Sequence, residues 1–397
     1  MSDSQTHHPS SQPPQNDAVS IPIEIISDHE MALIDAVSIP IEIISDHEMA
    51  LIDAAFSAVS RLKQNSVRSI SLLSKRKLTG CSTQNDVVGD IEEGGRKKKI
   101  VNESFLYSFR RRRGLSVTDL TSTEWCEKQM EFVLHLGRPE KTNAMKAGSA
   151  RHAALEEEVI KRVKVEAKSK EDIWALKLIN FIVGANQLVF DGLTRELPVI
   201  GFTEGIWITG VIDEIRMPLT ETDKVATLVD TKTRVRATLP SEPQRRNGRF
   251  QLMCYKHLWD TLAAGKFPYG QFFDFFSLNP NSELSTDIKN STAKTGFPAE
   301  TLSDVVIYYK NACCMLPQSN SQLLLRYENQ VDQTLIGEDQ FEHDSDWFET
   351  QIKTCLEFWM GNRSPHYAQK EERWKCNFCK FESVCERASN DEDKIDS

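Results

Sequence analysis

The sequence predicts an α/β fold over residues 104–388, and three observations point to it. A helical pattern, three strand-like segments and a second helical pattern follow one another, an order typical of a sheet with flanking helices. The chain has 397 residues, 40% of them hydrophobic, so it can bury at least one large core. Four cysteines bracket these segments, which indicates that distant parts of the fold are tied together.

The tail before this fold contains an internal duplication. Residues 1–16 are polar and rich in Pro and Ser, and we expect disorder there. The 18-residue segment 17–34 is repeated without change at 35–52. Two copies are too few for a solenoid, so we interpret them as a duplicated stretch of coding sequence. Residues 53–103 have the composition of a linker, and residues 389–397 form an acidic C-terminal tail.

Each copy of the repeat contains a short aliphatic motif followed by serine and acidic residues. The motifs are Ile23–Ile26 and Ile41–Ile44. They resemble SUMO-interacting motifs, which add a strand to the edge of a partner's sheet while their acids meet a basic rim. Two copies in one tail would raise the avidity for linked partners. We therefore expect SUMO as a binding partner.

The formal net charge of −10 is confined to the tail, because residues 1–60 hold ten acidic side chains and no Lys or Arg. The remainder has 48 acidic and 48 basic residues. Its basic side chains cluster at 96–99, at 110–113, and at Arg234, Arg236, Arg245, Arg246 and Arg249. Such runs are usually solvated surface, and the first is equally consistent with nuclear import. The last group surrounds Asp230-Thr231-Lys232, where a phosphate backbone would need cations.

The elements follow from hydrophobic periodicity and capping residues. Compact folding is expected near Leu115, with a short helix that carries Cys126 and is capped by Asp119 or Thr121. Residues 144–166 are predicted to be helical, because Leu155, Val159 and Val163 recur every four residues. The predicted strands are 195–200, 206–216 and 225–231, and the second helix is 251–262. Residues 268–350 show no clear pattern apart from a core-like aromatic run at 272–276.

The cysteine content favours a reducing compartment. Nine cysteines occur without a secretory signal, so clustered thiols are more apt to bind metal than to form disulfides. No apolar run reaches the length of a membrane span, and no membrane association is expected. An N-terminal transit peptide is not expected either, because such peptides are rich in Arg and poor in acids.

The C-terminal cysteines have the spacing of a metal site. Cys376, Cys379 and Cys385 form a C-x₂-C-x₅-C pattern that lacks one ligand, and Cys126 can complete it. Spacing alone leaves a zinc site and an iron–sulfur site open. The remaining cysteines have no motif partner and are expected to be buried thiols: Cys81, Cys254, Cys313, Cys314 and Cys355.

Two carboxylates and a lysine are candidates for catalysis. Alternation along a strand puts Asp230 and Lys232 on the same face. Asp213, on the preceding strand, shares its face with Val211 and Ile215, an unusual place for a carboxylate unless it is bound. Carboxylates on neighbouring strands can hold Mg²⁺ or Mn²⁺. The lysine beside them can position or activate a water molecule.

The flanking helices supply weaker signals. His152 lies on the apolar face of the first predicted helix, where a hydrogen-bonded core histidine is the more common case. Gly148, four residues earlier, would let this helix approach the strands closely. Gln251 and Tyr255, four residues apart, face the same way on the second helix.

The order of these motifs resembles the RecB-type branch of the PD-(D/E)xK nucleases. The cysteines narrow the resemblance to the iron–sulfur nucleases of that branch, and SVTDLTSTEWCEKQMEF around Cys126 is similar to the eukaryotic exonuclease V family. The resemblance covers residues 104–388. It implies a restriction-endonuclease-like core, in which helices flank a central mixed sheet, closed by a C-terminal Fe–S cluster region.

The resemblance also assigns roles to residues. Asp213, Asp230 and Lys232 match the catalytic residues, and Asp230 stands where many relatives have Glu. The implied Mg²⁺ ligands are Asp213, Asp230, the motif histidine His152 and, in addition, Glu196. The four cysteines Cys126, Cys376, Cys379 and Cys385 match the ligands of a [4Fe–4S] cluster. Residues expected to support the site or bind DNA are Gln251, Tyr255, Arg245, Arg246 and Arg249.

The implied function is that of a monomeric exonuclease specific for single-stranded DNA, with Mg²⁺ or Mn²⁺ as cofactor, in DNA repair. We expect it in the nucleus, with an additional organellar pool. Trp207, Tyr255 and Trp374 are candidates either for stacking on bases or for core packing. Two alternatives stay open: a non-catalytic scaffold that binds DNA ends, and a zinc-stapled protein whose D-x-K is accidental.

Overall fold

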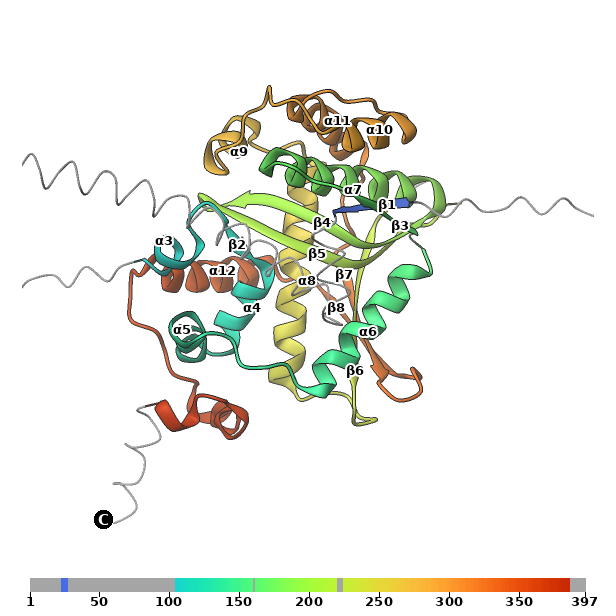
Figure 1. Ribbon diagram of the computed structural model, residues 1–397. Coiled ribbons are helices and arrows are strands. Elements are labelled where there is room, and N and C mark those ends of the chain that lie inside the picture. The colour runs from blue at the N-terminus through green and yellow to red at the C-terminus, as the bar shows by residue number, and fades with distance from the viewer. Residues whose placement is uncertain (1–22, 28–103, 160, 220–223, 386–397) are drawn as a thin grey trace, which may run out of the picture.

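A computed structural model of the chain describes residues 23–27, 104–159, 161–219 and 224–385. Its centre is a six-stranded mixed sheet in the order β2-β5-β6-β7-β8, with β4 paired to β5 (Figure 1). The pairs β2–β5 and β6–β7 are parallel and the others antiparallel. The strands are β2 (Leu115–Ser116), β4 (Leu193–Thr203), β5 (Ile206–Arg216), β6 (Thr227–Arg234), β7 (Gln322–Asn329) and β8 (Leu335–Glu342). The expected mixed sheet with flanking helices is confirmed.

One edge of β5 is only partly paired. Because β4 follows β5 along its length, β2 and β6 share the opposite edge. β2 pairs there at Ile208 and Thr209, and β6 pairs at 214–216. Among the described strands, residues 210–213 therefore have no partner on that edge. Asp213 lies at the end of this gap, where β5 and β6 separate.

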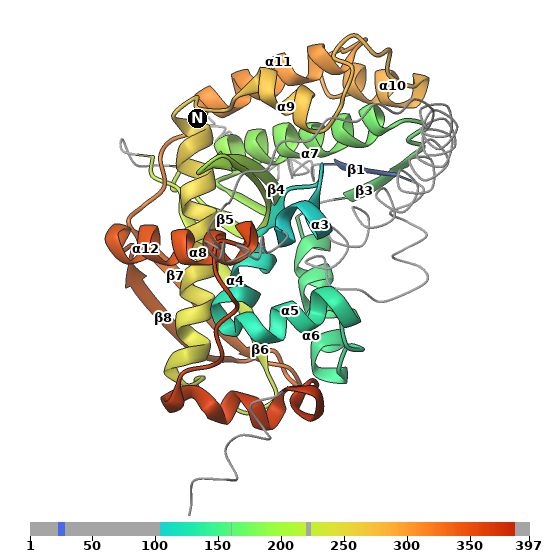
Figure 2. The same ribbon diagram turned by 90° about the vertical axis from the view of Figure 1, so that its left-hand side faces the viewer.

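Helices cover the sheet in two groups. α7 (Lys170–Asp191) packs along β4, and α11 (Leu302–Met315) packs on α7 at the top of Figure 1 with α9 (Tyr269–Phe275) and α10 (Thr286–Lys294). α8 (Glu242–Ala263) crosses β4, β6 and β7, and α4 (Val117–Trp125) and α12 (Ser345–Met360) pack against it (Figure 2). α3 (Phe105–Arg110), α5 (Glu127–Leu136) and α6 (Asn143–Glu157) complete the N-terminal half.

Large aromatic side chains fill the core between these layers. Trp207, Trp259 and Trp359 are almost completely buried. Phe272 and Phe276 are buried as well, which confirms the predicted core role of the aromatic run at 272–276.

α4 begins with a capping box, which fixes the approach to Cys126. Ser116 accepts a hydrogen bond from the Asp119 amide, and the Asp119 carboxylate accepts one from the Ser116 amide. Arg110 donates two further hydrogen bonds to Asp119, of 2.9 and 2.8 Å. The cap itself is Ser116, so the prediction of Asp119 or Thr121 as the cap is wrong by three or more residues. Asp119 instead completes the box.

The predicted helix over 144–166 is too long. α6 ends at Glu157, and β3 (Lys161–Val165) follows it. The four-residue spacing that joins Leu155 to Val159 and Val163 therefore crosses an element boundary. Apolar and basic residues alternate in KRVKV, and this pattern of period two is the one that forms the strand.

The first aliphatic motif of the duplicated tail lies within the described residues. Ile23–Ser27 forms β1, which pairs in parallel with β3 in a separate two-stranded sheet. The second motif, Ile41–Ile44, lies outside the described residues, as do Cys81 and the basic run 96–99. SUMO binding stays a prediction.

One described helix is long and apolar enough to cross a membrane by length and composition. This helix is α7, with a mean hydropathy of 1.5 over its most apolar window. The expectation that no apolar run reaches this length is therefore wrong. Most of that window is buried inside the fold, as in the core helix of a globular domain.

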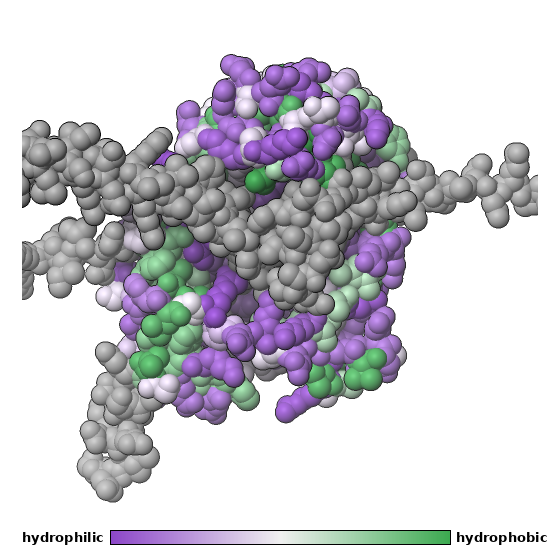
Figure 3. Space-filling view, in the orientation of Figure 1, coloured by the Kyte–Doolittle hydropathy of each residue, from purple (hydrophilic) through white to green (hydrophobic). Residues whose placement is uncertain are grey.

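The surface is mixed in polarity. In Figure 3, hydrophilic side chains dominate over α9 to α11, whereas hydrophobic ones gather over α5. An exposed large hydrophobic residue of this helix is Leu136.

Replacing Asp119 with Ala should lower the free energy of unfolding by about 3–5 kcal/mol, because it leaves Arg110 buried without its partner. Burial alone would raise the pKa of Asp119, but the charge and hydrogen bonds of Arg110 hold it well below its usual range. This contribution is therefore present above about pH 4 and is lost only as the pH falls through the depressed value. Urea denaturation measures the loss, and the exposed Arg111→Ala is the control, expected within about 0.5 kcal/mol of the wild type.

Candidate active site and cysteine site

Asp213 and Asp230 face each other across the gap between β5 and β6. The β5–β6 pairing ends at Glu214 and Val229, and Asp213 and Asp230 are the next residue on each strand, so their side chains lie on one face. Both are buried, Asp230 with 1% of its surface exposed. The Asp213 carboxylate accepts a hydrogen bond of 3.3 Å from the Thr231 amide, at the point where the two backbones have ceased to pair.

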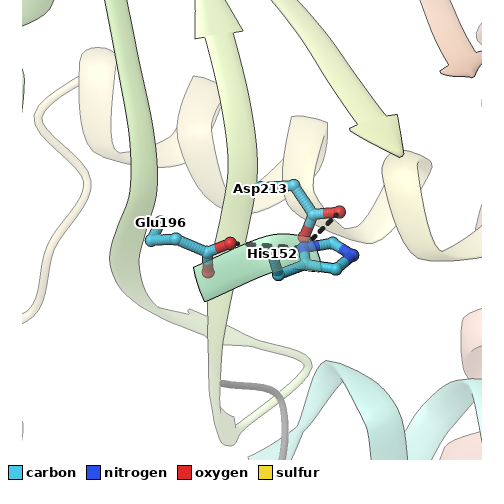
Figure 4. Close-up of side chains that lie close together, drawn as sticks. All are labelled: His152, Glu196 and Asp213. Carbon is cyan, nitrogen blue, oxygen red and sulfur yellow. Dashed lines mark hydrogen bonds and ion pairs between the residues drawn. The ribbon is translucent and has the colours of Figure 1, made fainter. Parts of the chain in front are cut away.

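Glu196 reaches the same place from β4 through an unusual backbone conformation. It lies opposite Asp213 in the β4–β5 register, and the pairing is interrupted at that position alone. Its φ of 49° is left-handed, which costs a non-glycine residue on the order of 1 kcal/mol. The distortion turns the carboxylate toward the gap (Figure 4).

Arg195 holds this distorted segment in place. Its guanidinium donates to Glu214 on β5 at 2.8 Å and to the Leu155 carbonyl and Glu158 at the end of α6. Arg195 was not among the residues predicted from the sequence. A signal was available, because adjacent charged residues, Arg195 and Glu196, interrupt an otherwise apolar strand.

His152 approaches the carboxylates from α6. Its Nδ1 lies 3.3 Å from Glu196 Oε1 and 3.7 Å from Asp213 Oδ2 (Figure 4). Ligand atoms of these three residues all lie within 4.8 Å of one another. A Cβ on Gly148 would lie 3.1 Å from Thr233 Oγ1, so the expected close approach of this helix to the strands is confirmed.

The carboxylate pair is arranged to receive a cation. Burial and the neighbouring charge of Asp230 raise the pKa of Asp213 well above its usual range. Within the described parts of the chain, neither carboxylate oxygen of Asp230 accepts a hydrogen bond of regular geometry, and its charged neighbour is the ammonium of Lys232, 3.0 Å from Oδ1. Buried carboxylate oxygens with so few partners, beside a further acid and a histidine, fit a hard divalent cation such as Mg²⁺.

Lys232 lies beside this pair. Its Nζ is 3.0 Å from Asp230 Oδ1 and donates to Gln251 Oε1 on α8 at 2.9 Å. Gln251 in turn lies 3.4 Å from the Tyr255 hydroxyl. Tyr255 and Trp207 are both buried, so their aromatic rings are core residues, whereas Trp374 is half-buried. The side-chain amide of Gln251 thus orients the Lys232 ammonium beside the two carboxylates.

The three arginines expected to bind DNA are occupied by internal acids. Arg245 pairs with Glu242, and Arg249 pairs with Asp339 and Glu242. Arg246 donates to Glu124 and Glu372 at 2.7 Å each. Arg246 therefore joins α8 to the end of α4 and to the C-terminal segment.

The four predicted cysteines meet, although Cys126 is far from the others in sequence. Cys126 lies between α4 and α5, whereas the other three lie in and after η1 (Lys370–Phe378) and around η2 (Glu382–Val384). All four line one cavity of about 240 Å³. Burial and the nearby thiols of Cys379 and Cys376 raise the pKa of Cys126. Four free thiols around a common cavity fit a sulfur-ligated metal group.

Ion pairs fasten the C-terminal segment to α4 and α5. Arg363 donates two hydrogen bonds to Glu127, the residue after Cys126. Lys375 donates to the Trp125 carbonyl and to Glu372, and its ammonium lies 4.0 Å from the Trp125 ring centroid. The cysteine site is therefore supported by polar contacts with the end of α4 and the start of α5.

The remaining described cysteines have mixed environments. Cys254, Cys313 and Cys355 are buried, as expected. Cys314 is exposed, so the expectation of a buried thiol is wrong there. It follows Cys313 on α11, and adjacent positions on a helix face different directions.

Comparison with known proteins gives one family. A family profile described as "Exonuclease V - a 5' deoxyribonuclease" matches residues 104–226, 216–311 and 294–387. The exonuclease V of Danio rerio is 30% identical over 314 residues, which cover 77% of this chain and 79% of the relative. The crystal structure of SSO0001 covers 67% of this chain and 93% of its own at 13% identity, but its TM-score of 0.24 is too low for a structural correspondence.

Replacing Asp213 with Asn should stabilise the protein in the absence of divalent cations, because it removes one of two opposed buried charges. A raised folded-state pKa means that stability is present at low pH and is lost as the pH rises through that pKa. The variant should therefore be more stable by about 1–3 kcal/mol at high pH and little changed at low pH. Chemical denaturation in EDTA between about pH 5 and about pH 9 measures the difference. An equal loss of stability at both ends of this range would contradict the charge repulsion, and the exposed Glu349→Gln is the control.

Proposed function

Because this chain belongs to the exonuclease V family, it is a nuclease, and we propose that it is a Mg²⁺-dependent exonuclease specific for single-stranded DNA, acting in DNA repair. The observation that carries the proposal is the buried pair Asp213 and Asp230 with Lys232 beside it. The family description names deoxyribonuclease activity, which supports DNA as the substrate. We further propose that the core is of the PD-(D/E)xK type.

The proposed metal ligands are the side chains gathered at the β5–β6 gap. Asp213, Glu196 and His152 have ligand atoms within 4.8 Å of one another, and Asp230 on β6 neighbours Asp213 as a fourth proposed ligand. Bound Mg²⁺ supplies Lewis-acid polarisation of the scissile phosphate and stabilises its transition-state charge. Removal of the like-charge repulsion between Asp213 and Asp230 adds to the affinity for the ion.

Lys232 orients the attacking water in this proposal. Its ammonium lies 3.0 Å from Asp230 Oδ1 and donates to Gln251 Oε1, so its position is defined before substrate binds. An ammonium at this position would hold a water or a phosphate oxygen for in-line attack. Gln251 acts as a positioning residue, since it contacts the lysine.

We propose that the four cysteines hold a [4Fe–4S] cluster with a structural role. A single zinc ion would draw all four sulfurs to about 2.3 Å from one point. The cavity of about 240 Å³, which the four thiols line together with nine other residues, has room for a group larger than one ion, and this supports the cluster. A cluster there would tie α4 and the C-terminal segment together.

A non-catalytic scaffold for DNA ends is the second candidate. The catalytic set argues against it, because Asp213, Asp230 and Lys232 are all present and in contact range of one site. We also propose a nuclear location with an organellar pool, for which the basic runs are the support. We propose binding to SUMO on the aliphatic motifs of the tail, and a monomeric state.

Asp230→Ala and Lys232→Ala should each lower the Mg²⁺-dependent degradation of end-labelled single strands by about a hundredfold or more, because the first removes a proposed metal ligand and the second removes a cation beside the reacting phosphate. The assay compares linear with circular substrates, and only linear strands should be degraded. Lys353→Gln, on the exposed face of α12, is the control and should retain full activity. Undiminished degradation by both site variants would favour the scaffold.

Cys126→Ser should abolish the brown colour and visible absorbance expected of an iron–sulfur protein, because it removes one of four ligands. Iron and acid-labile sulfide, measured on the purified protein, should fall together. Cys314→Ser is the matched control, since this thiol is exposed and outside the site. A wild-type protein that contains zinc and no sulfide would overturn the cluster.

A further inference from the structure

Arg234 differs from the other arginines near the catalytic residues. It is the last residue of β6 and is half-buried. Within the described residues, its Nε is buried without a hydrogen-bond partner, and its guanidinium forms no ion pair with an acid. Arg245, Arg246 and Arg249, by contrast, each pair with one or two carboxylates.

An unpaired, partly buried guanidinium is unfavourable in the free protein. Burial and the nearby charge of Arg236 lower the pKa of Arg234, which shows that its cation is poorly compensated. A partly desolvated cation without a counter-charge costs free energy that an anionic ligand can recover. Its planar fork of N–H donors matches the oxygens of a phosphate.

The guanidinium of Arg234 lies in line with the catalytic residues of β6. Asp230, Lys232 and Arg234 alternate along β6 and share one face, with about 7 Å between successive members. Tyr327 on β7 is paired with Lys232, so its side chain lies on the same face of the sheet as this row of three residues.

Solvent exposure increases along β6 from Asp230 toward the residues that follow Arg234. Asp230 is buried, the Lys232 side chain is 29% exposed, and residues 235–239 after Arg234 are fully on the surface. The end of β6 lies beside α6 at the lower side of the molecule in both views (Figure 1, Figure 2). A strand that reaches the carboxylates along β6 therefore passes Arg234 first.

We propose that Arg234 binds the phosphate adjacent to the scissile phosphate, and so sets the register of the strand in the site. The inference rests on the proposed function, because it takes Asp213 and Asp230 as the place of cleavage. The spacing along β6 is comparable with that of successive phosphates in an extended strand. Lys232 and Arg234 thus hold neighbouring phosphates with one charge each.

The first test is the salt dependence of binding to a single-stranded oligonucleotide in EDTA, which prevents Mg²⁺-dependent cleavage. For single strands, each phosphate contact contributes about 0.7 to the slope of log affinity against log salt. Arg234→Gln should lower the slope by about this amount, whereas Arg234→Lys should keep it. Lys353→Gln removes the same charge from α12 and should leave the slope unchanged. An unchanged slope in Arg234→Gln would overturn the inference.

The second test locates the contact on the substrate. Oligonucleotides that carry one uncharged methylphosphonate are cleaved with the linkage placed at successive positions around the scissile bond. In the wild type, one adjacent position should lower kcat/KM by about tenfold, the size of one charge-assisted contact. Arg234→Gln should show the same tenfold loss on the normal substrate and no further loss at that position.

The two tests distinguish a failure of the proposed function from a failure of the inference about Arg234. If the wild type neither binds nor cleaves single strands, the proposed function fails and the inference with it. If the wild type cleaves and the methylphosphonate penalty persists in Arg234→Gln, the inference alone fails. Thermal unfolding of Arg234→Gln and Arg234→Lys shows that each variant is folded before it is assayed.

Discussion

The repulsion between Asp213 and Asp230 is the constraint on which the rest of the site depends. Two carboxylates buried face to face are unfavourable, and the Lys232 ammonium beside Asp230 offsets part of their repulsion. Among the described strands, β5 has no partner over residues 210–213 on its edge toward β6, and Asp213 lies at the end of this gap. The left-handed Glu196 and the close approach of α6 at Gly148 direct further ligands to the same space.

Hydrophobic periodicity and turn residues predicted those elements whose bounds depend on the neighbouring sequence alone. β5 has the predicted bounds, 206–216, because its apolar residues are flanked by clear turns. The boundary between α6 and β3 could not be found this way, since Val159 and Val163 satisfy a helical spacing as well as a strand. The elements between 268 and 350 are stabilised by contacts with α7 and β6 that are remote in sequence.

The candidate site also contains residues that the sequence predicted and residues whose roles it could not predict. Residue type and motif order identified Asp213, Asp230, Lys232 and His152, and the structure brings them together. The roles of the arginines were not predictable, because their acidic partners are distant. Arg246 meets Glu124 and Glu372 at separations of 122 and 126 residues, and Arg249 meets Asp339 at 90. Which cation is free to meet a ligand depends on these tertiary pairs.

The distance along the chain between Cys126 and the other three cysteines has a consequence for biosynthesis. Asp213, Asp230 and Lys232 all leave the ribosome before Cys385 is made. At about 5–20 residues per second, roughly 8 to 30 s separate Lys232 from Cys385. During that interval a nascent chain carries its catalytic side chains without the C-terminal segment, whose Glu372 pairs with Arg246. Translation order therefore delays assembly of the finished fold until the final segment has docked.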